Sequence, residues 1–293
     1  MKIQIPLKKK HMTDFIFAVF RTVIILGLCY IILYPFFMKI ANSFKSYADF
    51  IDPTVRFIPK SFTLDNIRRT MDKISYFETL LNTTVISVVV GLVSTFISSF
   101  AGYGFARYKF KGKGLLFFGV IFTLIVPPQT VIIPLFVQFK DFLGIWNLLG
   151  TIFPVLILAL TGLSLKNGLY IFMLRQFYKN MPKELEEAAY LDGCGAMGTY
   201  FRIMLPSAKT MLLTIFLLSM AWQWTDMLYN PLFFQEFKLF SSVFSLAASG
   251  ESNIMGANMT SIATLLAVLP LALIYIIAQR FFVQSVERTG IVG

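Results

Sequence analysis

Residues 80–106, LLNTTVISVVVGLVSTFISSFAGYGFA, decide the fold class, because no side chain in this stretch is charged. A helix that crosses the hydrocarbon core of a bilayer needs about 20 predominantly apolar residues. The stretch therefore predicts a membrane-spanning helix. Other apolar stretches lie on both sides of it in the chain.

The composition of the whole chain agrees with a membrane protein. Of the 293 residues, 57% are hydrophobic and 14% are charged, and the mean hydropathy is +0.72. A soluble domain carries roughly 25% charged residues. The chain lacks the polar exterior that a soluble fold of this length needs, so much of its surface is expected to face lipid.

Five further stretches are apolar enough to be predicted as spans. They are residues 22–38, 115–139, a stretch from 142 or 151 to about 174, 211 to about 228, and 256–278. Pro127, Pro128 and Pro134 interrupt the third span, either as packing kinks or along a water-lined path. We predict an all-α, polytopic membrane protein with six transmembrane helices.

The distribution of lysine and arginine predicts the orientation. If the N-terminus is cytoplasmic, most basic residues fall in cytoplasmic segments, and the two later outside loops hold only Lys140 and Lys238. Basic residues favour the cytoplasmic side, although the first outside loop, about 45–75, breaks the pattern. We predict a multi-pass inner-membrane protein with cytoplasmic tails at 1–21 and 284–293 around a transmembrane domain at 22–283.

The excess of positive charge suggests lipid as a partner rather than nucleic acid. The net charge is +11, and the basic residues lie in short clusters between apolar runs, which suits an anionic leaflet. A groove for nucleic acid would interleave aromatic residues with the basic ones. Cys29, Cys194 and His11 are too few and too dispersed for a disulfide framework or a metal cluster.

The loop predicted between the fourth and fifth spans, residues 175–209, contains the sequence MPKELEEAAYLDG at 181–193. Pro182 suits the first position of a helix, and the glutamates at 184, 186 and 187 suit its positive N-terminal end. Gly193 suits the left-handed residue that ends a helix. The spacing predicts a narrow apolar face on this helix, formed by residues 185, 188, 189 and 191. Such a face either lies on the lipid surface or inserts into a groove of a partner protein.

The spacing within this loop resembles a known family. Glu187-Ala188-Ala189, then three residues, Gly193, nine residues and Ile203-x-Leu205-Pro206 are similar to the EAA signature of binding-protein-dependent ABC importer permeases. Other segments resemble the carbohydrate-type, maltose-permease-like branch. They are SFTLDN at 61–66, AGYGFARYKFKGK at 101–113, IPLF at 133–136, WTDMLYNPL at 224–232 and QRFFV at 279–283.

The resemblance implies a type I importer permease fold and a helix, 183–193, that couples the chain to an ATPase. The expected partners are a second homologous permease, two ATPase subunits, an extracytoplasmic solute-binding protein and membrane lipid. The residues that the resemblance assigns to coupling are Glu184, Glu187, Ala188, Ala189, Asp192, Gly193, Ile203, Leu205 and Pro206.

The chain has no phosphate loop of its own. The pattern G-x-x-x-x-G-K-[ST] is missing, and GKG at 112–114 has neither its spacing nor its hydroxyl. We expect a permease without catalytic residues, cofactor or metal, with ATP and Mg²⁺ held by the separate ATPase.

Two groups of residues are candidates for the translocation path. Lys166 and Asn167 lie in the fourth apolar stretch, where a charge suggests function unless it marks the end of the stretch or a break in it. Asp226, with Trp222, Trp224 and Tyr229, offers an acceptor and stacking faces, although such aromatics also serve as packing or belt residues. Lys166 also suggests an acidic, uronate-containing oligosaccharide, with a neutral one as the alternative.

Two other classes of protein were weighed. An ion-coupled secondary transporter would show internal repeats and buried titratable groups. A membrane-embedded enzyme would need a nucleophile with a base, or a metal cluster. Internal repeats, a relay of carboxylates or histidines, and a nucleophile with a base or a metal cluster are not evident in the sequence.

Overall fold

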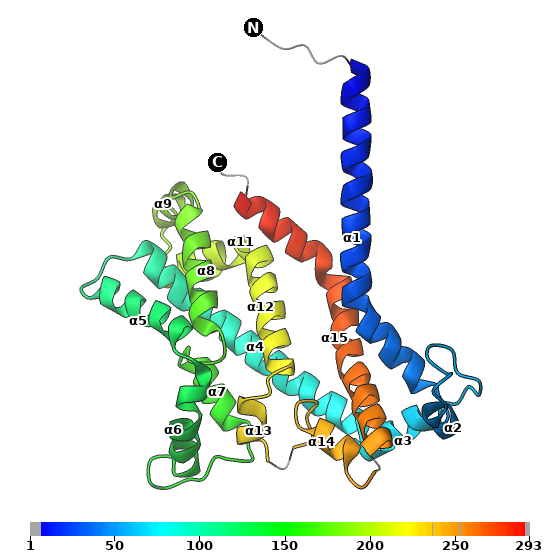
Figure 1. Cartoon of the computed structure of the whole chain (residues 1–293). Coiled ribbons are helices and arrows are strands. Elements are labelled where there is room, and N and C mark those ends of the chain that lie inside the picture. The colour runs from blue at the N-terminus through cyan, green and yellow to red at the C-terminus, as the bar shows by residue number, and fades with distance from the viewer. Residues whose placement is uncertain (1–6, 236, 252, 291–293) are drawn as a thin grey trace. The chain divides into compact units, whose positions relative to one another are not determined.

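Helices make up the regular structure of this protein (Figure 1). The computed structural model describes residues 7–235, 237–251 and 253–290. In those ranges no β-strand forms, and two isolated bridges join Lys45 to Phe62 and Phe142 to Trp146. The predicted all-α fold is confirmed.

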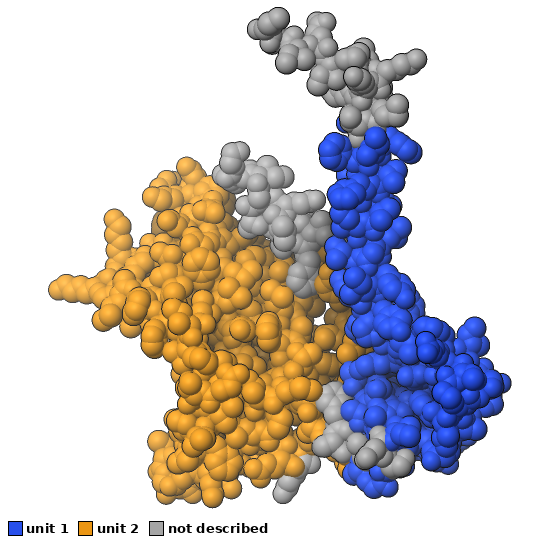
Figure 2. Space-filling model, viewed as in Figure 1, with its two compact units in different colours: residues 1–72, 247–266 blue, residues 73–246, 267–293 orange. Residues whose placement is uncertain are grey.

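The chain divides into two compact units (Figure 2). The first comprises residues 1–72 and 247–266, and the second comprises residues 73–246 and 267–293. All of the predicted coupling and path residues belong to the second unit.

The first unit is built on α1 (Leu7–Ser43), with α2 (Tyr47–Ile51) and most of α3 (Asp65–Lys73). The predicted span 22–38 lies inside α1, which begins at Leu7 within the stretch assigned to the N-terminal tail. Residues 1–6 of that tail lie outside the described residues, as do residues 291–293 of the C-terminal tail. Over its apolar stretch, α1 has no buried side chain inside its own unit, as expected for a lipid-facing helix.

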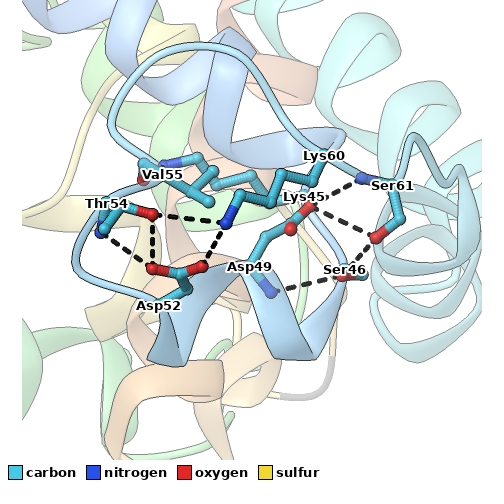
Figure 3. Close-up of polar contacts among 8 residues, drawn as sticks. All are labelled: Lys45, Ser46, Asp49, Asp52, Thr54, Val55, Lys60 and Ser61. Atoms are coloured by element: carbon cyan, nitrogen blue, oxygen red, sulfur yellow. Dashed lines mark hydrogen bonds and ion pairs between the residues drawn. The ribbon is translucent and has the colours of Figure 1, made fainter.

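Polar contacts brace the loop that follows α1 (Figure 3). The buried Lys45 ammonium donates hydrogen bonds to the carbonyl oxygens of Val55 and Arg56, at 3.1 and 2.9 Å. Asp49 Oδ2 accepts from the Ser61 N–H at 3.2 Å, and Lys60 Nζ lies 2.6 Å from Asp52 Oδ2. The loop is therefore an ordered structure rather than a slack connection.

The second unit is organised around α4 (Tyr76–Arg107), which contains the charge-free stretch 80–106. It packs against α7 (Phe153–Leu160), α8 (Asn167–Asn180) and α12 (Lys209–Trp224). Small side chains on α4 permit this packing: a Cβ atom on Gly102 would lie 2.8 Å from Leu174 Cβ of α8. Close approach through small residues is how helices associate where lipid removes the hydrophobic driving force.

The third and fourth predicted spans are each divided. In place of 115–139, α5 (Lys113–Ile125) and α6 (Pro128–Lys140) meet at 103°. Pro127 takes an extended conformation between them, and Pro128 has no N–H to continue α5. In the fourth span, residues 161–166 separate α7 from α8, because Gly162 and Lys166 have left-handed φ angles of 72° and 63°.

The fifth and sixth predicted spans correspond to α12 and to α15 (Asn253–Gly290). A second bent arrangement, at 77°, joins α12 to a helical stretch made of α10 (Ala196–Thr199), the π-helical turn η1 (Tyr200–Met204) and α11 (Leu205–Ser207). After α12 the chain forms the short helices α13 (Tyr229–Phe233) and α14 (Val243–Ala248).

The predicted count of six spans is not confirmed. Among the described residues, α1, α4 and α15 are by themselves long and apolar enough to cross a membrane. The count rises to five if each bent pair is one span. The fourth predicted span does not add to it, because its break leaves two short helices.

Candidate functional site

The predicted helix at 183–193 exists as α9, which runs from Glu184 to Leu191 (Figure 1). Its first turn is organised by Lys183, whose carbonyl accepts from the N–H groups of Glu186 and Glu187 at 2.9 and 3.1 Å. Pro182 therefore lies before the helix and is not its first residue, which corrects the prediction.

The end of α9 forms as predicted from Gly193, which has a left-handed φ of 81°. The Gly193 N–H donates to the Tyr190 carbonyl at 3.1 Å, and the Cys194 N–H donates to the Ala189 carbonyl at 2.9 Å. This pair of bonds is a Schellman motif, which satisfies the last carbonyls and fixes where the helix stops.

The side chains of the predicted coupling residues divide between two sides of α9. Ala189 is buried against the protein, whereas Ala188 is exposed. The Leu191 side chain is 89% exposed, so the predicted single apolar face through 185, 188, 189 and 191 is wrong. The exposed side also carries Glu184, Glu187, Tyr190 and Asp192.

An ion pair that the sequence did not reveal holds α9 against the last turn of α4. Arg107 Nε lies 3.3 Å from Glu186 Oε2, and the Tyr103 hydroxyl donates to Glu186 Oε1 at 2.8 Å. The two charged side chains are only 8% and 13% exposed. Arg107 Nη2 also donates to the Met181 carbonyl at 2.7 Å, so this one side chain of α4 contacts both α9 and the residues that precede α9.

Three buried tyrosines extend this anchor into the rest of the unit. The Tyr103 ring centroid lies 5.5 Å from that of Tyr178 on α8 and 5.1 Å from that of Tyr200 in η1. The Tyr200 hydroxyl donates to Ser99 Oγ at 2.9 Å, and the Tyr178 hydroxyl lies 2.7 Å from the same atom. Helix α9 is thereby connected through α4 to α8 and η1.

The second part of the EAA-like spacing lies in the bent stretch after α9. Ile203 belongs to η1, which packs against α9, and Leu205 and Pro206 belong to α11. The structure thus places η1, which contains Ile203, against α9. Leu205 and Pro206 lie beside the bend that leads into α12.

A cavity of about 260 Å³ lies where α5 and α6 meet the break before α8. Three of the predicted path residues, Lys166, Asn167 and Tyr229, line it together with Ser164, Thr123 and apolar side chains. Asn167 is only 1% exposed, and neither its Oδ1 nor its Nδ2 has a hydrogen-bond partner among the residues that the structure describes. Lys166 Nζ lies 4.9 Å from the centroid of the Trp222 ring, within range of a cation–π interaction.

Asp226, Trp222 and Trp224, which were also predicted for the path, do not line the cavity, and Asp226 and Trp224 have structural partners. The buried Asp226 carboxylate accepts from the N–H groups of Leu228, Tyr229 and Asn230 at 2.8 to 3.2 Å, which caps α13. Trp224 is buried, and its Nε1 donates to the Ala267 carbonyl at 3.0 Å. Asp226 and Trp224 therefore hold the site's surroundings in place, and Asp226 fixes the backbone of the cavity residue Tyr229.

Known proteins resemble the chain over most of its length. At 28% identity, 89% of the chain matches 84% of the probable ABC transporter permease protein YurM of Bacillus subtilis. The arabinooligosaccharides transport permease AraQ of the same organism is 25% identical over 94% of the chain and 98% of its own length. The probable starch degradation products permease AmyC of Thermoanaerobacterium thermosulfurigenes is 28% identical over 86% of the chain and 89% of its own length.

A solved structure shares the fold. It is a bacterial ABC transporter involved in the import of the acidic polysaccharide alginate, matched with a TM-score of 0.74 and 22% identity over 92% of this chain and 98% of that one. The family described as binding-protein-dependent transport system inner membrane component matches residues 94–288, which is more than half of the chain. Because this match includes α9 with its anchor and the cavity, the chain belongs to the family of inner-membrane components of binding-protein-dependent transport systems.

Proposed function

We propose that the chain is the non-catalytic permease subunit of an ATP-driven importer of sugars or oligosaccharides. The family assigns it to a transport system that depends on a binding protein. Relatives that match nearly the whole chain are named for the transport of arabinooligosaccharides and of starch degradation products. These names support a carbohydrate substrate for this chain as well.

The observation that carries the proposal is the construction of α9. The helix is capped at its end and tied at Glu186 to α4, yet it exposes Ala188, Tyr190 and Leu191. Apolar side chains on a rigid, exposed helix suit insertion into a groove on a partner. We assign that groove to a separate ATPase, which holds ATP and Mg²⁺, and place α9 and both termini in the cytoplasm.

The complete importer would contain a second homologous permease, two ATPase subunits and an extracytoplasmic solute-binding protein. In it, Glu184, Glu187, Ala188 and Asp192 would face the ATPase, and Ala189, Gly193 and η1 would hold the helix in position. A helix anchored by buried contacts can transmit displacement to α4, whereas a flexible loop would absorb it.

We propose the cavity beside Asn167 as part of the translocation path. The Asn167 amide has no partner in the described part of the chain, so it can both donate to and accept from a hydroxyl group, which is the chemistry that a sugar presents. Tyr229 adds a ring for stacking, and Asp226 supports its backbone from outside the cavity. Lys166 supplies a positive charge at the same wall.

The charge of Lys166 supports an acidic, uronate-containing oligosaccharide as the substrate. Its ammonium faces the Trp222 ring, and no carboxylate of the described residues pairs with it. Uptake by Lys166→Ala of charged and neutral sugars of equal length tests this. A selective loss for the charged sugar supports it, and an equal loss for both removes the charge preference.

Purification of the full chain from its own host tests the function itself. A permease should copurify with an ATPase, and a cysteine at position 188 should cross-link to that ATPase from the cytoplasmic side. An ion-coupled secondary transporter is the alternative, and uptake that continues without ATP hydrolysis would establish it.

A further inference from the structure

Four basic side chains gather where α5 begins. Lys113 is the first residue of α5, Lys109 precedes it in the turn from α4, and Arg175 and Lys179 lie four residues apart on α8. The Arg175 guanidinium lies 4.1 Å from the ring centroid of Phe117 in α5, and the charges of Arg175, Lys109 and Lys179 all act unfavourably on the Lys113 ammonium. We call these four residues the basic cluster.

Within the described residues, the basic cluster has no carboxylate partner. Lys113 Nζ donates to the Tyr108 carbonyl at 2.8 Å, and Arg175 Nε donates to the Phe105 carbonyl at 3.3 Å. Other basic residues of the chain do pair with acids, as in Lys60–Asp52, Arg107–Glu186 and Lys238–Glu78. The cluster thus keeps its full positive charge for a ligand.

The local backbone and an aromatic platform add to the suitability for an anion. The N-cap residue of α5 is Gly112, which has no side chain to cap this end of the helix, where the helix dipole favours negative charge. The Arg175 guanidinium lies 4.1 Å from the centroid of the Phe117 ring, which holds it in place without neutralising it. The Phe117 ring in turn lies 5.5 Å from Phe105 of α4 and 6.4 Å from Phe172 of α8, measured between centroids.

An apolar surface continues directly from the basic cluster. None of the residues of α5 is buried in the structure, and Leu115 is 76% exposed. Leu116, Phe118 and Phe122 are also exposed, and they extend the apolar surface along the helix. Positive charge at one end of an exposed apolar helix matches the two parts of an acidic phospholipid.

We propose that the basic cluster binds the phosphate headgroup of an acidic phospholipid whose acyl chains lie along α5. The headgroup would lie between Lys109, Lys113, Arg175 and Lys179. This site is independent of the transported substrate and of the ATPase contact. It would make the order of α5, and of the turn before it, depend on the lipid composition of the membrane.

The test uses the full chain in phosphatidylcholine nanodiscs that contain a small fraction of phosphatidylglycerol. Native mass spectrometry then measures how much phosphatidylglycerol remains bound after mild activation. Since each basic residue contributes about 1 kcal/mol to the binding of anionic lipid, Lys109→Ala/Lys179→Ala should weaken retention about thirtyfold. Arg175→Lys keeps the charge and should change retention little.

A matched double variant controls for net charge. Lys60→Ala/Lys140→Ala removes the same charge outside the cluster and should retain phosphatidylglycerol like the unmodified chain. Equal retention by both double variants overturns the proposal. It is also overturned if millimolar inorganic phosphate displaces the lipid completely, or if the cluster variant loses a second permease subunit while its lipid retention is unchanged.

Discussion

Arg107 Nε lies 3.3 Å from Glu186 Oε2 and joins the last residue of α4 to the first turn of α9. A buried pair of this kind does not need to stabilise the fold in order to matter, because it fixes the geometry between two elements. Here the two elements are the central helix of the second unit and the helix that we assign to the ATPase contact. Through this ion pair, a movement of α9 would be transmitted to α4.

Replacing Glu186 by alanine should uncouple transport from ATP hydrolysis. The variant leaves the mostly buried Arg107 without its partner, which costs about 3 kcal/mol for a buried pair. Because the exposed side of α9 is unchanged, hydrolysis by the assembled complex should persist while substrate uptake falls. Both rates are measured in proteoliposomes.

The exposed ion pair between Lys60 and Asp52 is the matched control for this prediction. Its side chains are 64% and 31% exposed, so solvent screens the pair, and Lys60→Ala should leave the ratio of uptake to hydrolysis unchanged. If Glu186→Ala kept a normal ratio, the anchor would have no part in coupling.

Gly193→Ala should destabilise the end of α9, because an alanine at φ 81° is strained by about 1 kcal/mol or more. Gly195→Ala is the control: its φ is −75° and no atom lies within 4 Å of the added Cβ. Cross-linking yield between position 188 and the ATPase reports on the helix. A yield that falls equally in both variants would contradict a role for the left-handed cap.

Gly102→Ala should weaken the packing of α4 on α8. The new Cβ would lie 2.8 Å from Leu174 Cβ and 3.0 Å from the Arg175 backbone nitrogen, and such overpacking costs about 1–3 kcal/mol. Gly104→Ala, two residues further along α4, meets no atom within 4 Å and should be tolerated. Thermal unfolding of the two variants in nanodiscs compares them, and equal midpoints would show that α8 can move away at no cost.

The sequence predicted the helical class of the fold, the α4 span and the left-handed Gly193, because these depend on local chemistry. Apolar length, charge and the conformational freedom of glycine can each be read from a few neighbouring residues. A break at Lys166 is one of the structural alternatives that the sequence offers, and the structure confirms it. Its geometry could not be foreseen, since Lys166 adopts a left-handed φ that its residue type disfavours. Tertiary packing around Asn167 and Gly168 holds it there.

The anchor of α9 was missed for a similar reason. The sequence presents Glu186 only as a charge near a helix N-terminus, and Arg107 only as one of the basic residues in the segment 101–113. Their contact joins positions 79 residues apart, which no local pattern reports. One signal was available: Tyr103 and Arg107 lie four residues apart, so they share a face of α4 and could be expected to bind one group together.

The loop after α1 should change its order with pH at both extremes. The hydrogen bond from Lys60 holds the pKa of Asp52 well below its usual range, and Asp52 raises the pKa of Lys60. The pair therefore stabilises the loop fully above the ordinary aspartate pKa of about 4. This stabilisation is lost as the pH falls through the lower pKa that Asp52 has in the folded protein. At high pH, the stabilisation by the pair is complete below the ordinary lysine pKa of about 10.4. It is lost as the pH rises through the higher pKa that Lys60 has in the folded protein.

NMR titration of the Asp52 carboxyl carbon measures the acid limb. Lys60→Met should return the titration midpoint toward the ordinary aspartate value. If Lys60→Met left the titration midpoint of Asp52 unchanged, the contacts with Thr54 alone would be what lowers the pKa of Asp52.

Asn167→Leu separates a binding role from a structural one, because the two roles predict opposite changes in stability. A buried amide without partners costs about 1–3 kcal/mol, so an apolar side chain of similar size should stabilise the unit while it abolishes hydrogen bonding to a sugar. We expect a higher midpoint of thermal unfolding together with reduced uptake.

Asn230→Leu is the contrast, since the Asn230 amide accepts from Gln223 Nε2 at 2.6 Å and donates to the Gln223 carbonyl at 3.0 Å. That variant should lose stability and uptake together. If Asn167→Leu did the same, the Asn167 amide would belong to the packing of the second unit, and the cavity would have to bind its substrate through other groups.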